Sequence, residues 1–212
     1  MCGDYIGEGA KECICGRCYA SLPRTEQAEK RGNSTEMALT GTLRLERAGA
    51  FLFYDKNHPI QHLIHQMKYA DRPEIGYYLG RQAAIEFQYA DFFDGIDIII
   101  PMPLHPKRYR ERGYNQSEYI ARGISDITGI PVDTTHVTRT KNTPKQALQQ
   151  GHERKQNVSD AFAVNHPAQM YHKHILLVDD LITTGETAKA CLRAMRWFRG
   201  ASFSVFALCK AQ

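Results

Sequence analysis

The fold is decided by one stretch of the sequence, which reads Leu177-Val178-Asp179-Asp180-Leu181-Ile182-Thr183-Thr184-Gly185-Glu186-Thr187. The apolar run His174–Val178 leads into it and predicts a buried parallel strand. A helix is expected from about Glu186 to Arg199, because apolar residues recur there at helical spacing, and Gly200 is expected to end it. The stretch therefore predicts a strand, a short polar loop and a helix, with two acids where the strand ends.

The acids and the loop carry chemistry as well as structure. Asp179 and Asp180 are expected in the crevice where open α/β sheets bind ligands, and adjacent carboxylates there need a cation or hydroxyl groups. The loop at 183–187 supplies three hydroxyls, a glycine that tolerates unusual backbone angles, and the unpaired amides of a helix N-terminus, all of which favour a phosphate dianion. Together they predict a sugar phosphate, with its phosphate on the amides and its diol on the carboxylates.

Other interpretations of this stretch stay open. The acids also fit a helix cap followed by a solvated carboxylate, and Thr183 with Glu186 fits a capping box. No Gly-x-x-x-x-Gly-Lys-Ser/Thr run and no Gly-x-Gly-x-x-Gly run occurs, which argues against a nucleoside-triphosphatase loop and a dinucleotide fold. A response-regulator acid pocket remains a competitor, although its acids and lysine would be spread over several strand ends.

The rest of the chain predicts more helices and strands around this unit. A strand at 96–100, a helix closed by Gly129, and short strands at 137–139 and 162–164 are expected, and a strand is expected at 203–209. Two further helices are predicted by apolar spacing, the first by Ile60, Leu63, Ile64 and Met67, the second by Ile75, Tyr78, Leu79 and Ala83. Strands that alternate with helices indicate an α/β fold whose parallel sheet has helices on both faces.

The domain organisation follows from length and composition. With 212 residues, 42% of them hydrophobic, one principal domain is expected at 41–212, preceded by a loop-rich, cysteine-containing appendage at 1–40. The longest apolar runs are far short of the roughly 20 residues of a membrane-spanning helix, and no secretory signal opens the chain, so a cytoplasmic protein is expected. The polar segment 140–159 is expected to form a mobile loop or hairpin.

The charge is distributed unevenly. The formal net charge is +4, and four cationic residues, Lys107, Arg108, Arg110 and Arg112, fall within six positions. Such a cluster favours an anionic partner, and the alternative is a solvated basic surface.

Two segments resemble known families. The run from Val178 to Thr187 resembles the phosphoribosyl-pyrophosphate signature of type I phosphoribosyltransferases. Upstream, Pro101-Met102-Pro103-Leu104-His105-Pro106-Lys107-Arg108-Tyr109-Arg110-Glu111-Arg112-Gly113-Tyr114-Asn115-Gln116-Ser117 is similar to a segment typical of the ComF family, which includes GntX-like proteins. With the helices from Ile60 onward, the similarity covers nearly the whole chain and implies a phosphoribosyltransferase-like fold.

The resemblance also implies roles for individual residues. Asp179 and Asp180 would hold the ribose hydroxyls of phosphoribosyl pyrophosphate, directly or through Mg²⁺. The loop after Ile100 would lie near the pyrophosphate, in agreement with its basic residues. The 5′-phosphate would lie on the loop of Thr183, Thr184, Gly185, Glu186 and Thr187, and the pyrophosphate candidates are Lys107, Arg108 and Arg112, followed by Asn115 and Gln116. Asn115 or Ser117 can instead cap the next helix.

Two functions follow from this resemblance. As a transferase or hydrolase acting on phosphoribosyl pyrophosphate, the protein would let an incoming nucleophile displace pyrophosphate at the ribose C1, and the loop 141–157 would close over the site. No spacing identifies a general base or the acceptor. As a non-catalytic accessory, it would serve competence and DNA uptake beside a helicase-like partner, and its basic patch would bind single-stranded DNA with strong salt dependence.

The N-terminal cysteines and the histidines at 58–65 are interpreted separately. Cys15-Gly16-Arg17-Cys18 is a Cys-x-x-Cys knuckle, and with Cys2 and Cys13 it supplies the four thiolates that a Zn²⁺ site takes. ComF-like proteins have two such pairs, the first of which would here need a cysteine just before Met1. Reduced, unliganded thiols are the alternative. Three histidines at helical spacing, His58, His62 and His65, are expected on a solvated face.

Overall fold

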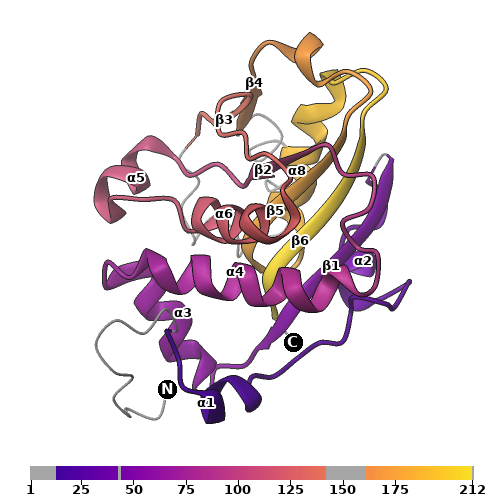
Figure 1. The fold of residues 1–212 in the computed structure, drawn as a ribbon. Coiled ribbons are helices and arrows are strands. Elements are labelled where there is room, and N and C mark those ends of the chain that lie inside the picture. The colour runs from indigo at the N-terminus through magenta and orange to yellow at the C-terminus, as the bar shows by residue number, and fades with distance from the viewer. Residues whose placement is uncertain (1–12, 43, 142–160, 212) are drawn as a thin grey trace.

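A four-stranded parallel sheet forms the centre of the computed structural model, which describes residues 13–42, 44–141 and 161–211 (Figure 1). The strand order is β1-β6-β5-β2. Their bounds are β1 Leu45–Tyr54, β2 Ile98–Pro101, β5 His174–Ile182 and β6 Ser202–Ala211. The predicted parallel α/β sheet is therefore confirmed.

Helices cover both faces of the sheet, as predicted. Leu176 and Val178 of β5 point into one core, and Ile175 and Leu177 point into the other, because successive strand residues face opposite sides. The first face is covered by α3 Ile60–Tyr69, α4 Pro73–Gln88 and α6 Gln116–Thr128, and the second by α8 Glu186–Ala194, which continues into the 3-10 turn Met195–Trp197.

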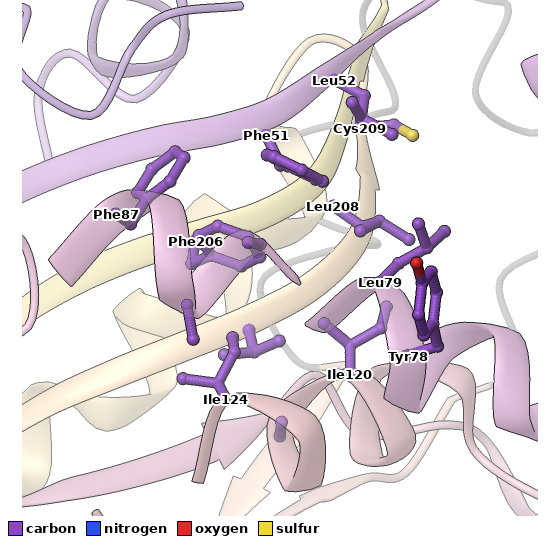
Figure 2. Packing of buried hydrophobic residues seen from close by; sticks show 14 of the residues in the cluster. Phe51, Leu52, Tyr78, Leu79, Phe87, Ile120, Ile124, Phe206, Leu208 and Cys209 are labelled. Atoms are coloured by element: carbon purple, nitrogen blue, oxygen red, sulfur yellow. The ribbon is translucent and has the colours of Figure 1, made fainter. Parts of the chain in front are cut away.

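The first core is aromatic at its centre. Figure 2 shows Phe87 of α4 against Phe206 of β6, with ring centroids 5.2 Å apart in edge-to-face contact. The two covering helices approach closely through glycines: a Cβ at Gly80 would lie 2.3 Å from the Ile120 carbonyl oxygen, and one at Gly123 would lie 2.2 Å from that of Tyr77. Side-chain volume is thus absent where α4 crosses α6, so the two helix backbones can approach each other closely.

The described part of the predicted appendage packs against this sheet. It contains two short helices, α1 Gly16–Ala20 and α2 Ser34–Ala38. Ile14, Cys18 and Leu22 are buried in the first core, so this segment shares its hydrophobic contacts. The strand β1 follows, and no strand was expected there from the sequence.

The connections differ in detail from the expected ones. The segment after β2 contains a helix, α5 Pro106–Arg112, which ends at Gly113 in the left-handed conformation. β3 Val137–Arg139 pairs antiparallel with β4 Phe162–Val164 in a separate two-stranded sheet, as their sequences suggested, and the 3-10 turn Pro167–Met170 follows. The expected lid falls almost wholly at 142–160, outside the described residues. Across the described ranges, every helix is too short or too polar to cross a bilayer.

Candidate functional site

The acid pair lies inside a strand rather than after its end. β5 continues to Ile182, four residues beyond the predicted end at Val178, because β6 stays paired with it as far as Lys210. β2, on the other side of β5, ends opposite Val178. Asp179 and Asp180 therefore lie where one neighbouring strand stops and the carboxyl edge of the sheet opens.

A cavity of about 220 Å³ occupies this opening. Its walls come from α3, the segment after β2, the start of α6, β3, β5 and the start of α8. The lining residues are Lys68, Met102, Pro103, Leu104, Arg108, Arg112, Asn115, Gln116, Ser117, Arg139, Asp179, Asp180, Leu181 and Thr187. Seven residues expected from the sequence are thus brought together: Arg108, Arg112, Asn115, Gln116, Asp179, Asp180 and Thr187.

Two residues of the cavity wall each carry a buried donor that has no partner among the described residues. Gln116 is only 1% exposed, and its Oε1 accepts a 2.8 Å hydrogen bond from Arg112 Nη1. Its Nε2, and the Nε of Arg139, have no hydrogen-bond partner within the described part of the chain. Leaving a buried donor unpaired costs about 1–3 kcal/mol, so such atoms call for a ligand or water. With Arg108 and Arg112 in the same wall, these donors suit an anion.

The carboxylates are held by short-range contacts. Lys68 Nζ lies 3.0 Å from Asp180 Oδ2, and Ser117 Oγ donates to Asp179 Oδ1 at 3.4 Å. Burial, and then the negative charge of Asp180, raise the pKa of the Asp179 carboxyl. Burial alone would lower the pKa of Lys68, but the Asp180 carboxylate outweighs it and raises that pKa. The two carboxylates therefore repel each other, and Asp180 has the Lys68 ammonium as its counter-ion.

The acid pair supplies oxygen donors, the type that Mg²⁺ prefers. One of the two carboxylates, however, already has an ammonium group within hydrogen-bonding distance. As it stands, the pair does not fit a metal ion bound directly between its two carboxylates.

The loop after β5 leaves the N-terminus of α8 without a side-chain cap. Gly185, with φ of +79°, is the N-cap of α8. The Thr183–Glu186 capping box is therefore not formed. Thr183 and Thr184 are exposed, and neither hydroxyl bonds to any described residue. The loop is adjacent to the cavity, but only Thr187 of its five residues lines it.

The structure separates one candidate from the site and adds others. Lys107 is exposed on α5 and does not line the cavity. Lys68 and Arg139 line it but were not expected. For Arg139 a signal existed, since it shares the strand face of buried Val137 and a charge on a buried face needs a reason. No such signal existed for Lys68, because its sequence context is that of an ordinary lysine near the end of a helix.

A second cavity adjoins the first. It has a volume of about 420 Å³ and shares four lining residues with the acid-pair cavity, Pro103, Leu104, Asn115 and Arg139. Tyr109, Glu118 and Thr138 are among the other residues of its wall.

The three predicted zinc ligands within the described residues, Cys13, Cys15 and Cys18, do not form a metal-binding group. Cys18 is buried in the first core, and Cys13 Sγ donates to the Glu74 carbonyl at 3.5 Å. Among described residues, no three His, Cys, Asp or Glu side chains are arranged to hold a metal. Cys2 lies outside the described residues, so the zinc site stays a prediction. His62 and His65 are exposed, which confirms their solvated face.

The sheet and its cavity define a parallel α/β protein with carboxylates and arginines gathered at the carboxyl edge of the sheet. Over 155 residues, 72% of the chain, it is 33% identical to the DNA utilization protein YhgH of Escherichia coli K12, of which it covers 67%. Competence protein F of Haemophilus influenzae is 32% identical over 116 residues, 54% of this chain and 51% of that protein. The chain belongs to the ComF family, which these relatives represent. No protein-family model matches it.

Solved structures show weaker likeness. Glutamine phosphoribosylpyrophosphate amidotransferase from B. subtilis aligns with 68% of this chain and 30% of its own, at 19% identity and a TM-score of 0.46. A hypoxanthine phosphoribosyltransferase from Staphylococcus aureus aligns with 74% and 82%, at 11% identity and a TM-score of 0.36.

Proposed function

We propose that the acid-pair cavity binds phosphoribosyl pyrophosphate. The observation that carries this proposal is the pair of buried, unpartnered donors, Gln116 Nε2 and Arg139 Nε, in a cavity that also contains two adjacent carboxylates. A simple anion would satisfy the donors but would offer no hydrogen-bond donors to the two carboxylates. A ligand that combines hydroxyl groups with phosphates satisfies both kinds of group.

The ligand is proposed to lie along the edge of the sheet. Its ribose hydroxyls donate to Asp179 and Asp180, whose carboxylates act only as acceptors while ionised. Its 5′-phosphate lies on the loop at 183–187, where backbone amides of the first turn of α8 point outward. Its pyrophosphate lies against Arg108 and Arg112, whose planar guanidinium groups match phosphate oxygens.

The proposed chemistry is displacement of pyrophosphate at the ribose C1. The arginines hold the leaving pyrophosphate and offset its growing negative charge, while the carboxylates fix the ribose and face the positive charge that develops on its ring. Mg²⁺, expected from the resemblance, would reach the cavity on the pyrophosphate oxygens and supply further charge neutralisation. The acceptor that attacks C1 is the part of the reaction still to be assigned.

A calorimetric titration tests this function directly. Phosphoribosyl pyrophosphate, with and without Mg²⁺, is titrated into the native chain, the Asp179→Asn/Asp180→Asn variant, and the control Asp126→Asn, which lies on α6 away from the cavity. Binding that survives in the control and is lost in the double variant supports the proposal. A folded native chain that gives no heat with the ligand would reject it.

A second candidate function, nucleic-acid binding, has a specific observation in its favour. A groove of about 190 Å³ beside α8 is lined by Lys189, Arg193 and Arg196. Next to it, Trp197 is 58% exposed, and the guanidinium of Arg196 lies 4.9 Å from its ring centroid. Cations beside an exposed aromatic ring suit a single strand, with phosphates on the cations and a base on the ring. The relatives are named for DNA utilization and competence.

Trp197 is the chain's single tryptophan, so its fluorescence reports this binding. Quenching by an oligothymidine that weakens steeply with salt, and is lost in Arg193→Ala/Arg196→Ala but kept in Asp179→Asn/Asp180→Asn, would support the second function. An unchanged response of the arginine variant would exclude this groove as the DNA surface.

A further inference from the structure

Lys68 is a half-buried cation in the wall of the cavity. It comes from α3, more than a hundred residues before the acid pair in the chain, and its side chain is 16% exposed. The partner carboxylate of Asp180 is 17% exposed, and the two charged atoms lie 3.0 Å apart. Ammonium groups are costly to bury unless they are paired, so a lysine held this way indicates a defined position.

Both chain neighbours of Lys68 are anchored to the segment that carries the arginines. The backbone carbonyl of Met67 accepts a hydrogen bond from the Tyr114 hydroxyl at 2.5 Å. The ring of Tyr69 lies 5.2 Å from the guanidinium carbon of Arg112. These two contacts, on either side of Lys68 in the chain, fix the end of α3 against the cavity wall. The Lys68 ammonium is thereby positioned at the acid pair.

The charges of the side chains in the cavity wall indicate the role of the Lys68 ammonium. Two carboxylates in the cavity wall stand against four cationic side chains, those of Lys68, Arg108, Arg112 and Arg139. A divalent cation at the pair would have to displace the ammonium from Asp180 and approach a wall that is already positive. A lysine ammonium is a compact, strongly hydrated point charge, and so resembles a small metal ion more closely than a guanidinium does.

We propose that Lys68 is a resident cation whose ammonium occupies the place beside Asp180 that a divalent cation would need, so that the free protein excludes divalent cations from the acid pair. A metal then enters the cavity only on the phosphate oxygens of a ligand. The ammonium also orients the Asp180 carboxylate, leaving its second oxygen and Asp179 to accept hydroxyl groups. This orienting role rests on the proposed function, whereas the exclusion of metal does not.

Mn²⁺ titration of the full-length chain, followed by electron paramagnetic resonance without any sugar phosphate, tests the exclusion. Lys68→Met is expected to bind Mn²⁺ at least tenfold more tightly than the native chain. Lys68→Arg, which keeps the charge, is expected to stay like the native chain, and Lys68→Met/Asp180→Asn is expected to lose the gained site. A folded Lys68→Met chain without a new Mn²⁺ site would overturn the proposal.

The native chain gives a test that needs no lysine variant. If Lys68→Met fails to fold, native and Asp180→Asn chains are compared, and equal, weak Mn²⁺ binding is expected of both. Tight Mn²⁺ binding by the native chain that Asp180→Asn removes would overturn the proposal. Because no ligand is added, a failure of phosphoribosyl pyrophosphate to bind would count against the proposed function and leave this test intact.

The orienting role has its own readout. Ribose 5-phosphate carries the hydroxyls without the pyrophosphate, and its affinity for the native chain is expected to be the same in EDTA as in Mg²⁺. In Lys68→Met the affinity in EDTA is expected to fall at least tenfold and to recover partly with Mg²⁺. Native binding that requires Mg²⁺ would show that Lys68 does not serve as the cation.

Discussion

Gly185 meets two demands at a single residue. Its φ of +79° lies in the left-handed region, and a Cβ there would be 2.7 Å from the Ala38 carbonyl oxygen. The first demand is conformational, and the second comes from α2 packing over the loop. No other residue type satisfies both, which explains a glycine at the point where the loop at 183–187 turns into α8.

Substituting Gly185 and Gly129 by alanine separates the two demands. Gly129 has nearly the same φ, +74°, but open space around its Cβ position. Gly129→Ala is expected to lower the free energy of unfolding by about 1 kcal/mol, the strain of a left-handed alanine. Gly185→Ala is expected to lower it by about 2–4 kcal/mol, because the backbone clash adds to that strain. Equal losses in urea denaturation would contradict the role of α2.

Arg139 is a partly buried cation in the cavity wall. Burial, and then the nearby charge of Arg108, lower the pKa of its guanidinium, which means that the folded protein disfavours its charge. Arg139→Met is therefore expected to leave the free energy of unfolding unchanged or raise it by about 1 kcal/mol, while weakening phosphoribosyl pyrophosphate binding at least tenfold. The matched control is Arg122→Met on the surface, paired with Glu118, which should change neither quantity measurably.

At the scale of elements, the closest contact is the crossing of α4 and α6. Gly123→Ala is expected to lower the free energy of unfolding by about 2–4 kcal/mol, because the new Cβ meets the rigid carbonyl of Tyr77 at 2.2 Å. Gly76→Ala on α4 is the control: its nearest contact is the flexible Met67 sulfur at 3.2 Å, and alanine favours the helix. A larger loss at Gly76 than at Gly123 in denaturation would refute this packing argument.

Elements whose apolar residues recur at a regular spacing could be predicted from the sequence. Elements whose position or end depends on contacts with distant parts of the chain could not. α3 and α4 bury the faces that their apolar spacing indicated. β1 was missed because Glu46, Arg47 and Gly49 interrupt its start and its later residues are buried without alternation. The end of β5 was misplaced because pairing with β6, a tertiary effect, extends the strand past two acids.

The residues of the candidate site also fall into those that the sequence could predict and those that it could not. Residues contiguous in sequence, such as the acid pair and the segment carrying Arg108 and Arg112, were identified as candidates because their spacing is local. Lys68 and Arg139 reach the cavity through the packing of α3 and β3, which no local pattern encodes. Thr183 and Thr184 were expected in the site, and the described structure leaves them beside the cavity rather than in its wall.

The free energy of unfolding is expected to depend on pH through His174, at the start of β5. Burial lowers the pKa of His174, whose Nε2 lies 2.9 Å from the Ser204 hydroxyl. A lowered folded-state pKa favours the neutral ring, so its contribution to stability is complete above the unfolded pKa, about 6.5, and is lost as pH falls through the folded value. His174→Gln is expected to reduce the loss of stability from pH 7 to pH 5, measured by urea denaturation. His62→Gln, at an exposed position, should leave the native profile in place.

At the scale of the whole molecule, the cavity joins segments from most of the chain. Lys68 comes from the first half, Arg108 to Ser117 from the middle, and Asp179 to Thr187 from the last sixth. Each segment is held by a different part of the core, so the cavity exists only when α3, α6 and the sheet are packed together. A ligand that contacts all three groups binds the folded chain alone and must stabilise it as a unit.

Ligand linkage makes this expectation quantitative. Phosphoribosyl pyrophosphate at one hundred times its dissociation constant is expected to raise the free energy of unfolding by about 2.7 kcal/mol, because it binds the folded state only. For a chain of this size that corresponds to a rise in Tm of roughly 5–10 °C by calorimetry, given that about 1 kcal/mol moves Tm by about 2–4 °C. At the same ligand concentration, Asp179→Asn/Asp180→Asn is expected to show no rise. Trp197→Ala, remote from the cavity, is expected to keep the full rise, and an equal rise in all three chains would mean that the ligand stabilises the protein from some other surface.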